Sequence, residues 1–491
     1  MSTSYSAVVA HLRRTFKSGR TLPLSQRREQ LKALRNLLTE NEDDICDAIY
    51  KDIRRSKPEA FCYEIVSVLN EIDTSLSEMN EWAKPQPVRK DLLFAIDGAE
   101  IVKDPVGVVL LIGTWNYPLS MALTPLVGAL VAGNCAIVKP SEISAHTAEI
   151  LEQLVPKYLD QDVVRVICAD AKATTELLKE RFDHIFFTGA PAIGKIIMQA
   201  ASKHLTPVTL ELGGKCPAIV DSSCDLDVVG KRIAWGKFMS NGQTCLAPDY
   251  VLCTSDVKSG LLDVIRRTVI EFYGEDPKQS KDYSRIISAK HFDRLVPFLE
   301  NSGTVVFGGN TDRSDLYIAP TILDNAKPTD PIMEDEIFGP ILPVVTVANV
   351  DEAVQVVKDG EKPLACYIFS KDQNAVKKIL RETNSGGVTV NDVILHFALN
   401  SLPFGGVGKS GMGRYHGKYS FDTFTHEKAV LRRGQNLEAL LWMRYPPFDD
   451  SKFRWAKLLT KKRDLPSLAT LKVVALFMLG LLCGYLLRGL L

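Results

Sequence analysis

The chain has 491 residues, 46% of them hydrophobic, and its 59 Lys and Arg residues balance its 59 Asp and Glu residues. This composition can bury a large core and excludes a disordered chain, while the length suggests about three folding units. The balanced charge provides no basic field for a phosphate backbone, so we expect no nucleic-acid partner. The ten cysteines are scattered, without a C-x-x-C pair or a His pair at metal-ligand spacing, and indicate reduced thiols and no metal site.

The first predicted element is a helical layer ahead of residue 85. Leu31, Leu34, Leu37 and Leu38 recur at intervals that place them on one face of a helix. We therefore expect a helix over residues 27–38.

Short apolar runs then alternate with helical patterns. The predicted strands are 107–114, 134–140, 163–167, 184–189 and 207–212, and the predicted helices are 118–131, 145–154, 172–180 and 193–201. A second alternation of strand and helix patterns, from residue 218 to 390, predicts strands near 250–253, 344–347, 365–369 and 387–391. Such alternation is typical of βαβ units on parallel sheets, which bind ligands at the carboxyl ends of their strands. The predicted fold class is α/β.

The run GGVGKSG at residues 405–411 resembles phosphate-binding loops in its glycine spacing. A P-loop needs a glycine where this chain has Pro403, and no predicted strand leads into the run. We therefore expect a tight loop here without a phosphate site.

The C-terminal tail is strongly apolar. Residues 473–487 carry no charge. Extending the run back to Leu465 adds only one charged residue, Lys472, and gives a helix of about 34 Å, which is long enough for a bilayer core. Basic residues stand just upstream, as expected on a cytoplasmic face: Lys452, Arg454, Lys457, Lys461, Lys462 and Arg463. We expect a membrane anchor with the body in the cytosol; an amphipathic core helix or a helix lying in the interface are the alternatives.

Four short segments carry candidate chemistry. Cys245, in GQTCLAPDY, lies outside any periodic apolar run and is a candidate nucleophile, although buried inert cysteines are common. Glu211 ends a predicted strand and is followed by two glycines, which let a ligand approach the backbone. Asn116 follows the first strand of the alternating region, and residues 334–340 read EDEIFGP.

The motifs FTGAPAIGK, ELGGK, GQTC, EIFGP and PFGGVGKSGMG, in this order, resemble the NAD(P)-dependent aldehyde dehydrogenase superfamily over about residues 5–430. The run RYPPF at 444–448 and the apolar tail look most like the membrane-bound fatty aldehyde dehydrogenase branch, class 3. The resemblance implies a Rossmann-like parallel-sheet cofactor domain, a second α/β catalytic domain, a small oligomerisation arm and a C-terminal membrane helix. The implied bounds are 1–210 with 396–430 for the NAD-binding domain and arm, 211–395 for the catalytic domain, 431–464 for an apolar and basic extension, and 465–491 for the anchor.

By the same resemblance, Cys245 attacks the aldehyde, the Asn116 amide and the Cys245 backbone N–H hold the oxyanion, and Glu211 is the general base. Lys139 and Glu142 match the adenosine-ribose ligands, Glu336 matches the nicotinamide-ribose ligand, and Phe338 packs near the ring. The pyrophosphate would meet the helix start formed by Gly189, Ala190, Pro191, Ala192, Ile193 and Gly194. Because Ala190 stands where the family usually has a hydroxyl, we expect main-chain contacts there, with NAD as the first expectation and NADP left open.

The resemblance implies oxidation of medium- to long-chain aliphatic aldehydes to fatty acids with NAD+ by a homodimer, with residues 95–103 as the candidate dimer arm. The alternatives are a broad-specificity enzyme that also accepts aromatic aldehydes, an acylating enzyme that uses coenzyme A, and a non-catalytic membrane scaffold. Glu211 argues against the acylating enzyme, and the retention of Cys245, Glu211 and Asn116 argues against the scaffold. The endoplasmic reticulum is the expected membrane, with peroxisomal and outer mitochondrial membranes as alternatives.

Overall fold

The computed structural model describes residues 4–91, 94–436 and 438–460. The chain divides into two compact units, which we describe separately. The first comprises Met1–Trp82 and Pro105–His426, and the second comprises Ala83–Asp104 and Glu427–Leu491. Every residue that the sequence predicts to bind the cofactor or to take part in catalysis belongs to the first unit. The predicted division of that unit into a cofactor and a catalytic domain stays a prediction.

The first sheet of this unit has six strands in the order β17-β7-β6-β3-β4-β5. Its five parallel strands are those predicted between residues 107 and 212: β3 (Val108–Ile112), β4 (Cys135–Lys139), β5 (Val164–Val166), β6 (His184–Thr188) and β7 (Val208–Glu211). Strands β3, β4 and β6 are buried along their whole length, as expected for strands covered by helices on both faces. The predicted Rossmann-like parallel sheet is confirmed.

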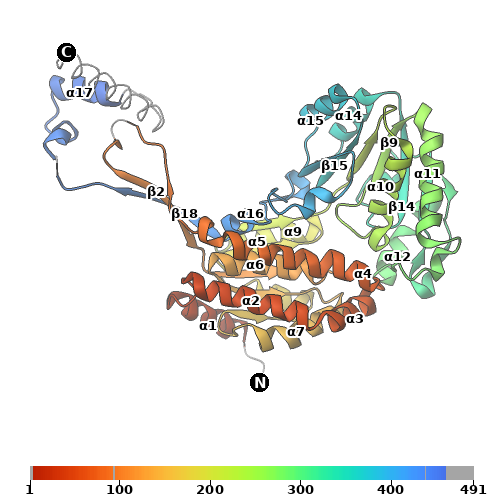
Figure 1. The fold of residues 1–491 in the computed structure, drawn as a ribbon, viewed down its shortest axis with the longest axis horizontal. Helices are drawn as coiled ribbons and strands as arrows, with labels where there is room; N and C mark the ends of the chain where they lie inside the picture. The colour runs from red at the N-terminus through yellow and green to blue at the C-terminus, as the bar shows by residue number, and fades with distance from the viewer. Residues whose placement is uncertain (1–3, 92–93, 437, 461–491) are drawn as a thin grey trace, which may run out of the picture. The chain divides into compact units, whose positions relative to one another are not determined.

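Helices cover this sheet. The predicted helices correspond to α2 (Leu24–Glu40), α6 (Ser120–Ala132), α7 (Ala145–Tyr158), α8 (Ala171–Leu177) and α9 (Pro191–Ser202). All of α6 is buried, since α2 and α5 (Val66–Trp82) pack against it, as Figure 1 shows, and α16 (Lys418–Thr423) does the same. The remaining N-terminal helices are α1 (Tyr5–Lys17), α3 (Glu42–Ile53), α4 (Lys57–Ala60) and the π-helical turn η1 (Phe61–Ile65).

The second sheet has seven strands in the order β10-β13-β14-β9-β8-β15-β16. The four strands predicted from the sequence are β9 (Tyr250–Thr254), β14 (Ile341–Val347), β15 (Ala365–Phe369) and β16 (Gly387–Val390), and three were not predicted: β8 (Pro217–Val220), β10 (Thr304–Phe307) and β13 (Thr321–Asp324). Only β10 is antiparallel to its neighbour.

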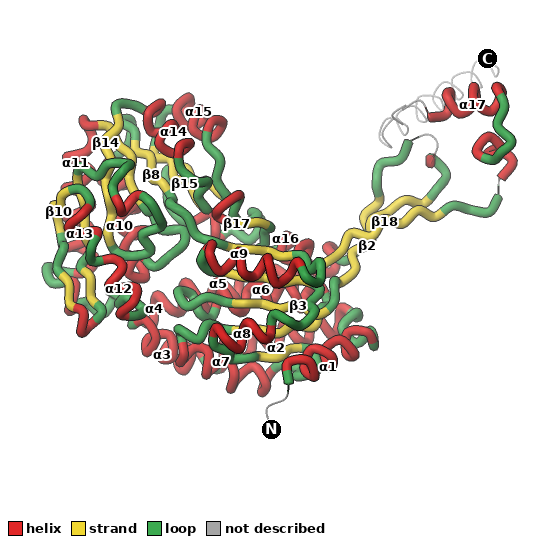
Figure 2. The backbone as a smooth tube through the Cα atoms, turned by 180° about the vertical axis from the view of Figure 1, so that it is seen from behind, coloured by secondary structure: helices red, strands yellow, loops and turns green. Residues whose placement is uncertain are grey.

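The helices of this sheet are α10 (Leu226–Phe238), α11 (Ser255–Tyr273), α12 (Ala289–Leu295), α13 (Phe298–Asn301), α14 (Val350–Asp359) and α15 (Gln373–Glu382). Helices α14 and α15 lie together in both views (Figures 1 and 2). A two-stranded ribbon, β11 (Thr311–Asp312) with β12 (Tyr317–Ile318), completes this part of the unit.

The glycine-rich run at 405–411 forms a 3-10 turn, Gly408–Ser410, and then the short strand β17 (Gly411–Met412). The predicted tight loop is therefore confirmed. Strand β17 pairs antiparallel with β7, with Gly411 opposite Glu211. The loop thus completes the edge of the first sheet beside a predicted catalytic residue.

The second unit holds a three-stranded sheet in the order β1-β2-β18, made of Gln86–Pro87, Gly98–Pro105 and Thr425–Arg432. Four ion pairs join the β2 segment to the β18 segment: Arg433–Asp97, Arg432–Glu100, Lys103–Glu427 and Lys428–Asp104. The 3-10 helix η9 (Glu438–Arg444) and α17 (Asp450–Thr460) follow.

No helix within the described parts of the chain has both the length and the apolar character needed to cross a membrane. The predicted anchor, residues 465–491, lies outside the described residues.

Candidate active site

A cavity of about 270 Å³ in the first unit has Cys245 in its lining. Its walls are mainly apolar and aromatic, and they include Tyr63, Tyr117, Met121, Trp235, Met239 and Phe397. Cys245 is a partly exposed residue. The nucleophile predicted from the sequence therefore lines an apolar cavity.

Glu211 is fixed at the end of β7 by strands on both sides. It pairs with Thr188 of β6 and with Gly411 of β17, and its side chain is 2% exposed. Burial raises the pKa of the Glu211 carboxyl to about 8, while a hydrogen bond with Cys245 lowers it. Oε1 of Glu211 has no hydrogen-bond partner among the described residues. One carboxyl oxygen is thus free to receive a water molecule.

The Cys245 thiol is neutral in this environment. Burial raises its pKa well above the usual value, and the nearby charges of Glu211 and Glu336 raise it further. Since the thiolate is the reactive form, the proton needs an acceptor before the sulfur can attack. The Glu211 carboxylate, hydrogen-bonded to the thiol, is an acceptor within reach.

Asn116 is 3% exposed, and its Nδ2 donates to the Gln243 carbonyl at 3.0 Å. This bond uses one of the two amide hydrogens and leaves the second for a ligand. The structure therefore places the Asn116 amide beside the segment that carries Cys245, and it brings Cys245 and Glu211 into contact.

Gln243 was missed by the sequence analysis, although it belongs to the GQTC motif. Its Nε2 donates to the carbonyls of Ser240 and Arg285 at 3.2 and 2.9 Å, and its Oε1 accepts from the Ile287 N–H at 2.9 Å. These contacts tie the segment before Cys245 to residues 285–287. Arg285 and Ile287 lie 42 and 44 residues away from Gln243 in the chain, so spacing in the sequence gave no signal for these contacts.

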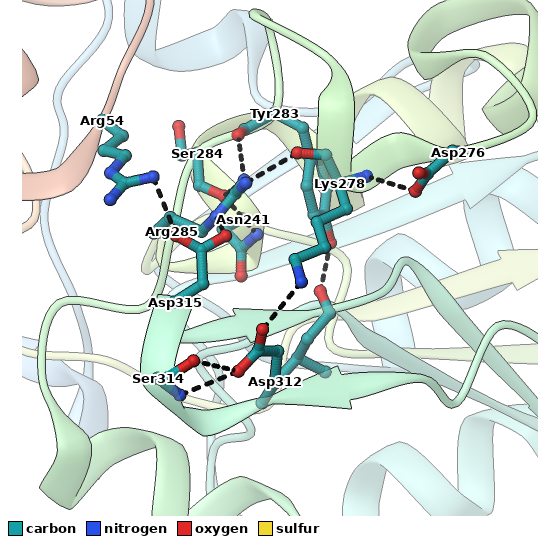
Figure 3. A network of polar contacts seen from close by, with 11 residues as sticks. Arg54, Asn241, Asp276, Lys278, Tyr283, Ser284, Arg285, Asp312, Ser314 and Asp315 are labelled. Carbon is teal, nitrogen blue, oxygen red and sulfur yellow. Dashed lines mark hydrogen bonds and ion pairs between the residues drawn. The ribbon is translucent and has the colours of Figure 1, made fainter.

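A polar network supports residues 285–287 from below (Figure 3). Nε of Arg285 lies 2.9 Å from Asp315, which also accepts from Arg54 at 2.8 Å. Asn241 donates to the Ser284 carbonyl at 2.9 Å, and Lys278 pairs with Asp312 at 2.7 Å. The network therefore positions the main chain on which Gln243 depends.

The residues predicted to bind adenosine and pyrophosphate lie at the carboxyl ends of strands of the first sheet. Lys139 ends β4, and its Nζ lies 2.5 Å from Oε2 of Glu142, whose side chain is 40% exposed. Gly189 follows β6, and Ala190 is the N-cap of α9 without a side-chain capping bond. Ala190, Ala192 and Ile193 are exposed, and Pro191 and Gly194 complete the turn. A helix start without a side-chain cap fits a pyrophosphate group held by main-chain N–H groups.

Glu336 and Phe338 lie closer to the catalytic residues. The Gly214 N–H donates to Glu336, and burial raises the pKa of the Glu336 carboxyl well above its usual value. A Cβ on Gly213 would lie 1.8 Å from Oε2 of Glu336, so this close approach requires glycine. The Phe338 ring packs edge-on against Trp115, with the centroids 5.4 Å apart. Glu336 lies near enough to Cys245 for its charge to raise the pKa of the thiol, and the predicted contacts of Glu336 and Phe338 with the cofactor stay predictions.

Lys237 is a second residue that the sequence analysis missed. It is completely buried in α10, and its Nζ has no hydrogen-bond partner among the described residues. Burial lowers the pKa of its ammonium group to about 8, against the attraction of Asp249 and Glu336. A buried cation therefore lies near the predicted nicotinamide-ribose ligand.

Two α/β sheets with a Cys–Glu pair beside an apolar cavity agree with the NAD(P)-dependent oxidoreductase that the sequence motifs resemble. Residues 2–430 match the model of the Aldehyde dehydrogenase family, and the chain belongs to this family. It is an NAD(P)-dependent aldehyde dehydrogenase.

Its similarity to known proteins extends over nearly the whole chain. Aldehyde dehydrogenase family 3 member A2 of Rattus norvegicus is 53% identical over 455 residues, which cover 93% of this chain and 94% of the relative. The dimeric, NADP-preferring aldehyde dehydrogenase of Rattus norvegicus is 49% identical over 91% of this chain and 98% of its own length. The structure of Staphylococcus aureus AldH in a substrate-bound state matches with a TM-score of 0.90 at 41% identity, covering 94% of this chain and all of that one.

Proposed function

We propose that this enzyme oxidises medium- to long-chain aliphatic aldehydes to fatty acids with NAD+. The observation that carries the proposal is the apolar cavity of about 270 Å³ that Cys245 lines. An aliphatic chain in such a cavity gains about 0.8 kcal/mol for each buried methylene. The wall gives no charged partner for a polar substrate, since the lining residues are apolar, aromatic or neutral polar.

The proposed chemistry begins when Glu211 accepts the thiol proton and the Cys245 sulfur attacks the carbonyl carbon. The Asn116 amide and the Cys245 backbone N–H hold the oxyanion of the resulting thiohemiacetal. NAD+, when bound, supplies the hydride acceptor that converts this adduct to a thioester. Glu211 passes the thiol proton to solvent, and its carboxylate then removes a proton from water, which attacks the thioester carbonyl. The Cys245 thiolate leaves, takes that proton from Glu211, and the fatty acid is released.

Cofactor binding is proposed for the residues described above. Lys139 and Glu142 would hold the adenosine ribose, Gly189 to Gly194 the pyrophosphate, Glu336 the second ribose, and Phe338 the ring. The Glu142 carboxylate disfavours a 2′-phosphate, whereas Lys139 attracts one. NAD is therefore the proposed cofactor, and one relative whose name says it prefers NADP keeps NADP as the second candidate.

The finer proposals on location and assembly depend on the C-terminal segments. We propose a tail anchor at 465–491 in the endoplasmic reticulum membrane, with the catalytic body in the cytosol, supported by the apolar sequence and its basic flank. Segment 431–464 would link the body to the anchor. A homodimer through the arm at 95–103 is supported by a relative named as dimeric.

Steady-state assays of the full chain with saturated aldehydes of two to sixteen carbons, and with NAD or NADP, test the proposal. We expect kcat/KM to rise with chain length and to be higher with NAD. Cys245→Ala abolishes turnover, whereas Cys224→Ala, on a half-buried thiol away from the cavity, retains it. Preference for benzaldehyde over long aliphatic aldehydes would instead support the broad-specificity alternative, and acceleration by coenzyme A would support the acylating one.

A further inference from the structure

We propose that Arg55 is a positioning residue for aldehyde oxidation, which acts by holding the Asn116 loop in place relative to the turn that precedes Cys245. The inference rests on the proposed function, because it assumes that the Asn116 amide holds the oxyanion. Arg55 follows α3, and no motif in the sequence drew attention to it.

The Arg55 guanidinium is completely buried and contacts three separate segments. Its Nη1 lies 2.5 Å from Oε1 of Glu64. Its Nη2 donates to the main-chain carbonyl of Asn116 at 2.6 Å and also to Oγ of Ser240. The face of the guanidinium packs on the ring of Tyr117, 4.4 Å from the centroid. Both terminal nitrogens and one face of the guanidinium are therefore fixed, whereas its Nε has no hydrogen-bond partner among the described residues.

Glu64, the ion-pair partner of Arg55, binds the other end of the loop that carries Asn116. It is completely buried, and its Oε2 accepts from the N–H groups of Leu119 and Ser120 at 2.8 and 3.1 Å. Ser120 is the first residue of α6. The ion pair thus holds the loop at Asn116 through Arg55 and at the helix start through Glu64.

The contact with Ser240 reaches the segment of the nucleophile. Ser240 and Asn241 have φ values of 51° and 58°, a left-handed conformation that is unfavourable for a residue with a Cβ such as Ser240. Arg55 holds the Ser240 hydroxyl, and Glu59 accepts a hydrogen bond from the Ser240 backbone. These contacts retain a strained turn five residues before Cys245.

Arginine is suited to this place for a geometric reason. A buried ion pair adds little net stability when a well-packed apolar pair could replace it, so stability alone does not account for the pair. The planar fork of arginine holds several acceptors in fixed directions, which a lysine ammonium cannot do. One cation therefore sets the position of the oxyanion donor relative to the nucleophile.

The test is a double-mutant cycle of Arg55→Lys with Asn116→Ala in the full chain, read as kcat/KM for one aldehyde. In the parent, we expect Arg55→Lys to lower kcat/KM about 100-fold, the cost of a misplacement near 1 Å. The decrease should be in kcat, with the KM for NAD changed less than about threefold. In the Asn116→Ala background, the same change should cost less than about threefold, because the group that Arg55 positions is already gone.

Equal losses in both backgrounds would overturn the inference, since Arg55 would then act on stability alone. Full activity of Asn116→Ala by itself would instead refute the proposed oxyanion role. Arg27→Lys is the matched control. Arg27 is also buried and donates to three main-chain carbonyls, and none of these three residues lines the cavity. We expect it to keep kcat.

If Arg55→Lys does not fold, Ser240→Ala takes its place in the cycle. It removes one acceptor of the fork and keeps the ion pair, so we expect a smaller loss of about tenfold that again disappears in the Asn116→Ala background. A loss that persists there would overturn the inference.

Discussion

Glu211 and Cys245 share a hydrogen bond in a place where burial raises the pKa of both groups. At neutral pH both groups therefore mainly hold their protons, and Glu211 must ionise before it can accept the proton of the thiol. Oε1 of Glu211, which has no hydrogen-bond partner among the described residues, then allows the same carboxyl to accept a proton from water after the sulfur has been acylated. One residue can therefore act in both proton transfers of the proposed reaction.

The pKa of about 8 predicts how thioester hydrolysis depends on pH. Only the ionised Glu211 can accept a proton, so the rate of acyl-enzyme breakdown should rise about tenfold per pH unit below pH 8 and level off above it. Single-turnover measurements of fatty acid release between pH 5.5 and 10 would show this. A rate that does not vary over this range would exclude Glu211 as the base.

Glu211→Gln is the matched variant for this measurement. It keeps the size of the side chain but cannot accept the proton, so we expect fatty acid release to fall about 10²- to 10⁴-fold and the pH dependence below pH 8 to disappear. An unchanged pH profile in this variant would assign the pKa to another group.

The sequence predicted the three catalytic candidates because they stand in compact motifs. The structure brings Cys245 and Glu211 into contact and holds Asn116 beside them, although their roles stay predictions. Arg55 could not be found in this way. Its contact with Ser240 joins positions 185 residues apart, and an arginine in the short link between two helices has no pattern of its own.

At the scale of elements, the loop at 405–411 matters because it places β17 next to β7. Gly411 has a φ of 141°, and a Cβ there would lie 2.1 Å from the Leu210 carbonyl oxygen. A side chain at this position would therefore push β17 away from the strand that ends in Glu211.

We accordingly expect Gly411→Ala to lower both the melting temperature and kcat. Gly360→Ala is the control, because a Cβ on Gly360 would make only ordinary contacts, the nearest at 3.7 Å. Thermal unfolding and steady-state kinetics of the two variants would check this. A Gly411→Ala enzyme with unchanged kcat would show that Glu211 does not depend on β17 for its position.

Elements were predictable where the pattern was strong. The strands of the first sheet were identified because their apolar runs are buried on both faces. Strand β8 was missed since it has only four residues and follows directly on the ELGGK motif. Strands β1 and β2 were missed because the sheet of the second unit buries few side chains and leaves little apolar pattern.

At the scale of the whole molecule, the proposed anchor can be separated from catalysis. A chain that ends at residue 464 should remain in the supernatant after high-speed centrifugation and should keep its kcat with a short, water-soluble aldehyde. As a control in the full chain, Leu479→Arg places a charge in the apolar run, at a cost of about 2.5–3.5 kcal/mol at the centre of a bilayer, and should weaken membrane association. Equal membrane association of the shortened chain would refute the anchor.

The α/β class and the family were predictable from the sequence, and the family model confirms the family. How the strands combine was not predictable, because the order β10-β13-β14-β9-β8-β15-β16 joins segments by contacts that no local pattern encodes. The domain bounds, the anchor and the dimer stay predictions.

The pairing of Gly411 with Glu211 also has a consequence during translation. The ribosome adds about 5–20 residues per second, so the strand that completes this sheet edge is made about 10–40 s after the carboxylate it supports. Until then, the nascent chain contains the nucleophile and the base but not the neighbour that fixes one of them. The unfinished polypeptide therefore carries a reactive thiol before it can turn over an aldehyde.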